Sequence, residues 1–196
     1  MIKVYASGDS RSRRVLWACE EVGVPYEVVE LRFPPRLHHP EFLAISPAGA
    51  LPAIEDGDVS LIESLTICEY VSRKHGGTLS VEPTEPDYFA YLQFVQFGDA
   101  TLAPPLAWAR RFGARSPDIM AEAEEAFRLR LGVIEQALSD GREFLVADRI
   151  TVADISVGFT LGLSSMVKLH HLVPATVAAY EDRLRARPAY QRAYAA

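Results

Sequence analysis

The spacing of apolar residues changes part-way along the chain, and this change predicts two structural regions. The first region begins with short β-branched and aromatic runs, "MIKVYA" at 1–6 and "YEVVEL" at 26–31. Between these runs, apolar residues recur at helical spacing from Val15 to Val22. A strand, a helix and a second strand in this order form a βαβ unit, in which the two strands are parallel.

A short helix, a hairpin and a longer helix are expected in the rest of the first region. The apolar segment "EFLAI" at 41–45 follows a proline-rich loop and predicts the short helix. Asp56-Gly57 separates two brief β-type runs, as in a hairpin turn. A helix follows, whose apolar face consists of Leu65, Ile67, Cys68 and Val71. Residues 1–76 are therefore predicted to fold as βαβ-α-ββα.

Helical periodicity dominates the second region, where no segment alternates as a strand does. Ser116-Pro117 is typical of a helix start, and Thr151 with Asp154 predicts a capping box. The proline-rich and acidic stretch "VEPTEP" resembles an exposed linker. The fold class is thus α/β plus all-α, with domains at 1–76 and 86–196 joined by a linker at 77–85.

The composition and net charge of the chain exclude several classes of function. The chain has 196 residues, of which 49% are apolar, and a formal net charge of −6, which repels nucleic acid and anionic membranes. No apolar run approaches the roughly 20 residues of a membrane span, and no leader precedes Ile2, so we expect a cytoplasmic protein. Cys19 and Cys68 lie in apolar stretches, which favours buried thiols. The adjacent pair His170-His171 lacks metal-ligand spacing, so no metal is expected.

Three polar segments are expected to meet at one end of the predicted sheet. A cis peptide bond between Leu51 and Pro52 would turn the Leu51 backbone outward for an extended peptide, although most bonds before proline are trans. Glu63 and Ser64 begin a helix, where N–H groups bind a carboxylate and Glu63 accepts from an ammonium. A helix cap beside a solvated glutamate is the structural alternative. Ser10 would lie over the start of the first helix.

A serine hydroxyl at that position has a defined chemical use. A charge-assisted hydrogen bond stabilises an anion by about 1.5–3 kcal/mol. At about 1.4 kcal/mol per pKa unit, this lowers the pKa of a bound thiol by one to two units from about 8.5. Ser10 would therefore keep a bound thiol largely ionised at neutral pH.

These stretches resemble the cytosolic glutathione transferases, particularly bacterial members with a serine-type first helix. The similarity rests on "SRSRRVLW" at 10–17, "EEVGVPYE" at 20–27, "SPAGALP" at 46–52, and "ES" at 63–64. It continues in "FLVADRITVADIS" of the second region. The resemblance implies a thioredoxin-like domain followed by an all-helical one, and glutathione as co-substrate without a metal.

The resemblance also implies roles for individual residues. Leu51 would pair by its backbone with the cysteinyl part of glutathione beside a cis Pro52, while Glu63 and Ser64 hold the γ-glutamyl end. Ser10 would activate the thiol, and His39, in a loop with Arg36 and His38, would contact the glycyl carboxylate. An exposed polar loop is the alternative for the histidines.

Departures from the family pattern concern activation and affinity. Asp9 stands at the usual position of the catalytic hydroxyl, so Ser10 is the nearest candidate. Ala50 replaces a frequent lysine or arginine, and Ser46 a frequent asparagine. Tyr5, expected in the sheet, and Ser12, expected to be exposed in the first turn, are alternative hydroxyls. For Arg11, Arg13 and Arg14, a solvated helix face is expected of at least two, and an offset of the acidic ligand's charge is the alternative role.

The predicted function is conjugation of the glutathione thiolate to an electrophilic apolar small molecule by a homodimer. Phe97, Thr101 and Trp108 would line the electrophile pocket, or else pack in the core. Isomerisation, dehalogenation or peroxide reduction with glutathione on the same fold are alternative reactions. A non-catalytic binding or regulatory protein is the alternative from another class.

Overall fold

The computed structural model describes residues 1–8 and 10–195, which form two compact units. One unit contains Met1–Ser80 together with the C-terminal segment that begins at Pro188, and the other contains Val81–Arg187. The first has a four-stranded mixed sheet with helices, and the second is helical. The predicted fold class is therefore confirmed.

The first unit follows the predicted order of strands and helices. It consists of β1 (Ile2–Ala6), α1 (Ser12–Val22), β2 (Tyr26–Glu30), α2 (Pro35–His38), the 3-10 helix η1 (Pro40–Ala44), β3 (Ala53–Asp56), β4 (Val59–Ile62), α3 (Ser64–Lys74) and α9 (Pro188–Ala195). The short helix α2 lies in the stretch predicted as a loop. Four residues that begin with a proline give no helical periodicity by which to recognise it.

The sheet order is β2-β1-β3-β4. The β1 and β2 strands are parallel, as predicted, whereas β3 is antiparallel to both β1 and β4. Asp56 pairs with Val59 across the predicted hairpin, and Gly57 has a φ of 62°. This left-handed conformation favours glycine because it has no Cβ.

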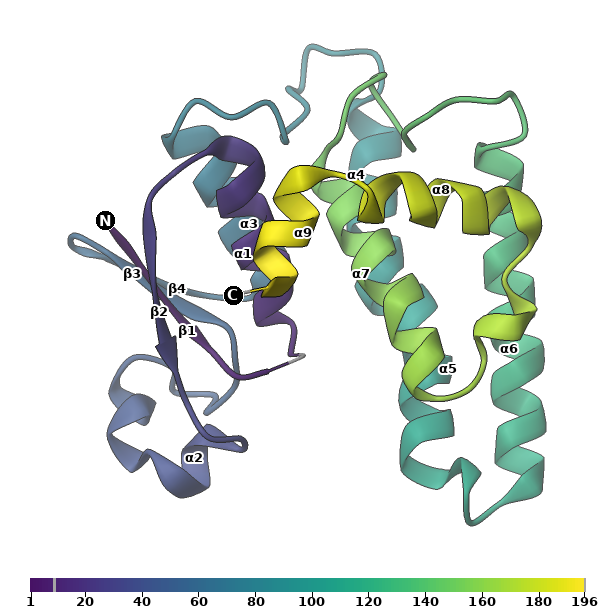
Figure 1. Cartoon of the computed structure of the whole chain (residues 1–196), viewed down its shortest axis with the longest axis horizontal. Helices are drawn as coiled ribbons and strands as arrows, with labels where there is room; N and C mark the ends of the chain where they lie inside the picture. The colour runs from purple at the N-terminus through teal and green to yellow at the C-terminus, as the bar shows by residue number, and fades with distance from the viewer. Residues whose placement is uncertain (9, 196) are drawn as a thin grey trace. The chain divides into compact units, whose positions relative to one another are not determined.

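Each face of the sheet is covered by different helices. Val4 and Ile54, on one face, are fully buried, and α1 and α3 lie together on one side of the sheet (Figure 1). Tyr5 and Ala53 are on the other face, in a core cluster with Phe42 of η1. The Tyr5 and Phe42 rings lie 5.4 Å apart. The sheet therefore has α1 and α3 on one face and η1 on the other.

The C-terminal helix α9 packs on α1 (Figure 1). The Tyr190 ring meets Trp17 edge-on with centroids 4.9 Å apart, and Tyr190 stacks on Tyr194 at 4.1 Å. Arg13 Nη1 donates to the Ala193 carbonyl at 2.7 Å. The structure differs here from the predicted boundary, which assigned this helix to the second domain. Only Ala186 and Arg187 separate α8 from α9, so no long linker in the sequence marks its return to the first unit.

Helices make up the second unit, as predicted. They are α4 (Tyr88–Gln96), the π-helix η2 (Phe97–Leu102), α5 (Ala103–Trp108), the π-helix η3 (Ala109–Gly113), α6 (Pro117–Ala137), α7 (Val152–Met166), the 3-10 helix η4 (His170–Leu172) and α8 (Ala175–Arg185). Ser116 caps α6 by accepting from the Ile119 amide at 3.4 Å. Within the described part of the chain, no helix combines the length and apolar character needed to span a bilayer.

The π-helix η2 is held by hydroxyl groups of α7. Pro104 and Pro105, which follow η2, have no N–H to donate to the helix ladder. Ser156 Oγ donates to the Val95 carbonyl at 2.8 Å, and Thr160 Oγ1 donates to the Gly98 carbonyl at 3.0 Å. A Cβ on Gly98 would lie 2.3 Å from Ser156 Oγ. Only glycine therefore permits this close crossing.

The predicted capping box at the start of α7 is confirmed. The Asp154 carboxylate accepts from the Thr151 amide at 2.8 Å and the Thr151 hydroxyl at 3.0 Å. It also accepts from the Leu145 amide at 3.0 Å and the Tyr180 hydroxyl at 2.9 Å. Burial raises the pKa of Asp154, although these donors oppose the shift. One carboxylate thus connects α7, α8 and the preceding loop.

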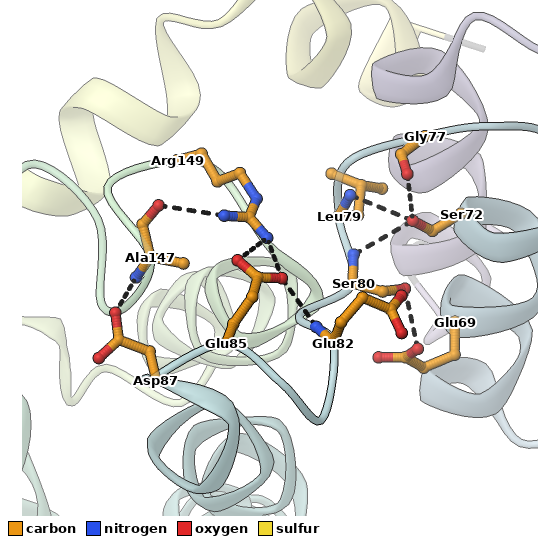
Figure 2. Close-up of polar contacts among 10 residues, drawn as sticks. All are labelled: Glu69, Ser72, Gly77, Leu79, Ser80, Glu82, Glu85, Asp87, Ala147 and Arg149. Atoms are coloured by element: carbon orange, nitrogen blue, oxygen red, sulfur yellow. Dashed lines mark hydrogen bonds and ion pairs between the residues drawn. The ribbon is translucent and has the colours of Figure 1, made fainter.

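Hydrogen bonds attach the linker segment to the nearest part of each unit (Figure 2). In the first unit, Ser72 Oγ donates to the Gly77 carbonyl and accepts from the amides of Leu79 and Ser80, each at 3.1 Å. In the second unit, Arg149 donates to both carboxylate oxygens of Glu85 at 2.9 Å. The chain passes from one unit to the other between these two attachments.

Candidate functional site

Strand register brings the predicted polar segments to one end of the sheet. Ala53, the first residue of β3, pairs with both Tyr5 near the end of β1 and Ile62 at the end of β4. The segments that follow β1, precede β3 and follow β4 therefore lie side by side. They contain Ser10, Leu51, Pro52, Glu63 and Ser64.

The turn before β3 presents the Leu51 backbone. The Leu51-Pro52 peptide bond is cis. Ser46, which is fully buried, donates through Oγ to the Ala50 carbonyl at 2.9 Å and accepts from the Ala50 amide at 3.3 Å. Gly49 has a φ of 60°, and a Cβ there would lie 2.9 Å from Arg36 Cβ. Ser46 and Gly49 thus hold the turn from which Leu51 emerges.

The start of α3 combines backbone donors with a buried cation. Glu63 is exposed and has a φ of 72°, a strained conformation for a residue with a side chain. Ser64, the first residue of α3, is buried and accepts from Arg14 Nη1 at 3.1 Å. The first N–H groups of α3 have no partner within the helix. This end of α3 is therefore suited to bind an anion.

Ser10 is half-buried, and its hydroxyl lies next to the Ser12 hydroxyl. Ser10 Oγ lies 2.7 Å from Ser12 Oγ and also accepts from the Ser12 amide at 3.3 Å. Ser12 is fully buried, so the prediction that it is exposed was wrong. It is the first residue of α1, and its polar side chain at a helix start does not indicate burial. Asp9 lies outside the described residues.

The histidines lie near the end of β2, next to the same sheet end. His38 is exposed on α2, whereas His39 is half-buried between α2 and η1. His39 Nε2 accepts from the Arg32 amide at 3.2 Å, and Nδ1 lies 3.4 Å from Glu41. The His39 side chain is therefore oriented by its neighbours.

Comparison with known proteins places the chain in a family. Residues 4–79 match the family model of the glutathione S-transferase N-terminal domain. A probable glutathione S-transferase of Oryza sativa subsp. japonica is 34% identical over 207 residues, spanning 97% of this chain and 94% of that protein. The chain belongs to the glutathione S-transferase family. Glutathione S-transferase 1 of Triticum aestivum is 31% identical and covers 91% of this chain and 86% of its own length.

Solved glutathione transferases have the same fold. A family member from Pseudomonas fluorescens, crystallised with two glutathione bound, is 26% identical with a TM-score of 0.87 and covers 98% of this chain and 92% of its own. URE2P6 from Phanerochaete chrysosporium, in complex with oxidized glutathione, is 27% identical with a TM-score of 0.85 and covers 99% and 94%.

In this glutathione S-transferase, the Tyr5 hydroxyl already has a hydrogen-bond partner, and the thiols of Cys19 and Cys68 are buried. Tyr5 donates to Glu55, and burial together with this carboxylate raises the pKa of Tyr5 to about 12. Burial likewise raises the pKa of Cys19 to about 12 and raises the pKa of Cys68. Both cysteines are free and buried, as predicted. Among the described residues, no group of histidine, cysteine and carboxylate side chains could hold a metal.

The arginines of α1 differ from the prediction of a mainly solvated face. Arg11 is exposed, but Arg13 is half-buried against α9, and Arg14 is fully buried. The helix pattern alone does not show that α3 and α9 enclose this side of α1. The contact at the candidate site that the sequence does not predict is the hydrogen bond between Arg14 and Ser64.

Proposed function

We propose that this chain binds glutathione at the shared sheet end and joins its sulfur to an apolar electrophile. The observation that supports this most is the meeting of three glutathione-type segments at one sheet end, in a chain that belongs to the glutathione S-transferase family. Relatives that share most of the chain bear the name glutathione S-transferase. The protein is accordingly a glutathione transferase, with glutathione as its co-substrate.

Each part of glutathione has a matching group on the chain. The Leu51 backbone, beside cis Pro52, pairs with the cysteinyl residue as an added strand would. The Ser64 hydroxyl and the first N–H groups of α3 donate to the γ-glutamyl carboxylate, and Glu63 accepts from its ammonium group. His39 contacts the glycyl carboxylate.

Ser10 is proposed to stabilise the thiolate. Ser10 Oγ accepts from the Ser12 amide and lies within hydrogen-bond distance of the Ser12 hydroxyl. When Ser12 donates both of these bonds, the Ser10 hydrogen is directed to another acceptor, the glutathione sulfur. The thiol proton passes to water, and the thiolate attacks the electrophilic carbon. A C–S bond forms, the leaving group departs with its electron pair, and no covalent enzyme intermediate is needed.

Finer features complete the proposal. We place the protein in a bacterial, serine-type group and in the cytoplasm, with a role in detoxification. A homodimer is supported by exposed apolar side chains on α4 and α6, which a second copy would cover: Phe89, Leu92, Leu129 and Val133. Within the second unit, Phe97 is buried and Thr101 half-buried, while 38% of Trp108 is exposed. Thr101 and Trp108 remain the candidates for contact with the electrophile.

A Ser10→Ala variant tests the role of the hydroxyl. We expect unchanged glutathione binding by calorimetry and a loss of turnover of roughly 10-fold to 150-fold, the equivalent of one charge-assisted hydrogen bond. The pH profile of kcat/KM would shift to higher pH because the bound thiol ionises less readily. Ser12→Ala should cause a smaller shift in the same direction, since it leaves Ser10 in place.

Two results would redirect the proposal. Unchanged turnover in Ser10→Ala removes Ser10 from the catalytic role. If millimolar glutathione produces neither heat nor thermal stabilisation of the wild-type protein, the non-catalytic alternative is correct instead. Assays with peroxides, halogenated substrates and isomerisable substrates separate conjugation from the other glutathione-dependent reactions.

A further inference from the structure

Arg14 is an unusual neighbour for the start of a ligand-binding helix. Its side chain is fully buried, and Nη1 donates to Ser64 Oγ at 3.1 Å. The backbone of Arg14 is also bonded to α3, because Cys68 Sγ donates to the Arg14 carbonyl at 3.4 Å. The guanidinium is therefore held in place next to the first residue of α3.

The contact restricts what the Ser64 hydroxyl can do. A serine hydroxyl has one hydrogen to donate and two lone pairs that accept. A guanidinium donates only, so Arg14 must occupy an acceptor position of Ser64 Oγ. The hydroxyl hydrogen is thereby turned away from Arg14, toward any acceptor in front of the helix.

We propose that Arg14 is a positioning residue that directs the Ser64 hydroxyl hydrogen at the γ-glutamyl carboxylate. The inference rests on the proposed function, which places that carboxylate at the start of α3. Hydrogen bonds that form a continuous chain polarise one another. The hydrogen bond donated by Arg14 therefore makes the Ser64 hydroxyl a stronger donor to the γ-glutamyl carboxylate. Arg14 would thus contribute to glutathione affinity through Ser64 and not to the chemical step.

The matched ligand is glutathione without this one carboxylate, 4-aminobutanoyl-cysteinylglycine. Calorimetry would measure the Kd of both ligands for wild type, Arg14→Gln, Ser64→Ala and the double variant. We expect each single variant to lose about tenfold or more in affinity for glutathione and to bind the analogue as wild type does. The double variant should be no weaker than Ser64→Ala alone, because Arg14 acts through the hydroxyl. Ser64→Thr, which keeps a hydroxyl, should bind glutathione with the affinity that Ser64→Ala loses.

Controls separate this role from general charge or stability. Arg11→Gln removes an exposed charge from the same stretch and should change neither Kd by more than about twofold. At saturating glutathione, kcat of Arg14→Gln should match wild type while KM rises. Equal losses for both ligands, or losses that add in the double variant, would show a merely structural role and overturn the inference.

A measurement on the wild-type protein covers the case in which Arg14→Gln does not fold. The nitrogen NMR signals of the Arg14 guanidinium should shift when glutathione binds, and much less with the analogue. The shift should disappear in Ser64→Ala. The same shift with both ligands would refute the inference while leaving the proposed function intact. A wild-type protein that binds neither ligand would refute both.

Discussion

Two helical glycines allow the same substitution to be tested with opposite expected results. Gly98 lies in η2 where α7 crosses, whereas Gly132 lies exposed in the middle of α6. A Cβ on Gly98 would lie 2.3 Å from Ser156 Oγ and 2.7 Å from the Ser156 carbonyl carbon and oxygen. A Cβ on Gly132 would meet nothing within 4 Å.

The expected magnitudes follow from these contacts. The serine oxygen can rotate away, but the carbonyl cannot, so the two helices must separate by about 1 Å to reach ordinary contact. That movement weakens the hydrogen bonds to the Val95 and Gly98 carbonyls, at about 1 kcal/mol each, in addition to the overpacking cost of about 1–3 kcal/mol. A gain of about 1 kcal/mol in helix propensity offsets part of this loss. Gly98→Ala should therefore destabilise the protein by about 2–4 kcal/mol, and Gly132→Ala should stabilise it by about 0.5–1 kcal/mol.

Urea unfolding followed by circular dichroism would measure both differences, and calorimetry would give Tm. At about 2–4 °C per kcal/mol for a chain of this size, Gly98→Ala should lower Tm by roughly 4–16 °C. Gly132→Ala should raise it by roughly 1–4 °C. If both variants change stability in the same direction, the close crossing of η2 and α7 is not the determining contact.

Two buried carboxylates give further predictions. Asp154→Ala leaves the Leu145 and Thr151 amides buried without their acceptor, at about 1–3 kcal/mol each, so we expect a loss of about 2–6 kcal/mol in urea unfolding. Tyr180→Phe, which removes one donor, should cost about 1 kcal/mol, and equal losses would contradict the reasoning. The hydrogen bond from Lys74 holds the pKa of Asp56 below its usual value, so its stabilising contribution is lost as pH falls below about 4. Asp56→Asn should therefore be less stable than wild type at neutral pH, with a difference that shrinks in acid; a difference independent of pH would argue against this role.

The sequence predicts the elements of the sheet end because their signals are local. The apolar spacing of β1 and α1, the Asp56-Gly57 turn and the start of α3 each lie within a few residues. Once the topology is known, the register brings Ser10, Leu51 and Ser64 to the same sheet end without any further information. The general position of the site is therefore predictable.

What the sequence does not predict depends on contacts between distant segments. Arg14 and Ser12 have the polar character of exposed residues near a helix start, yet packing of α1 against α3 buries both. The bond between Arg13 and Ala193 spans 180 positions. The π-helix η2 depends on hydroxyl groups of α7 that lie about 60 positions away in the chain. No periodicity within one helix could reveal these interactions.

The return of α9 to the first unit makes the helical unit an insertion in topological terms. The chain leaves the first unit after Ser80 and re-enters it at Pro188. A fragment cut at the first crossing would lack the ring that covers Trp17, so it would not be an independent copy of the glutathione-binding unit. Exchange of the helical unit between relatives would accordingly need two junctions, with the native carboxyl-terminal helix retained.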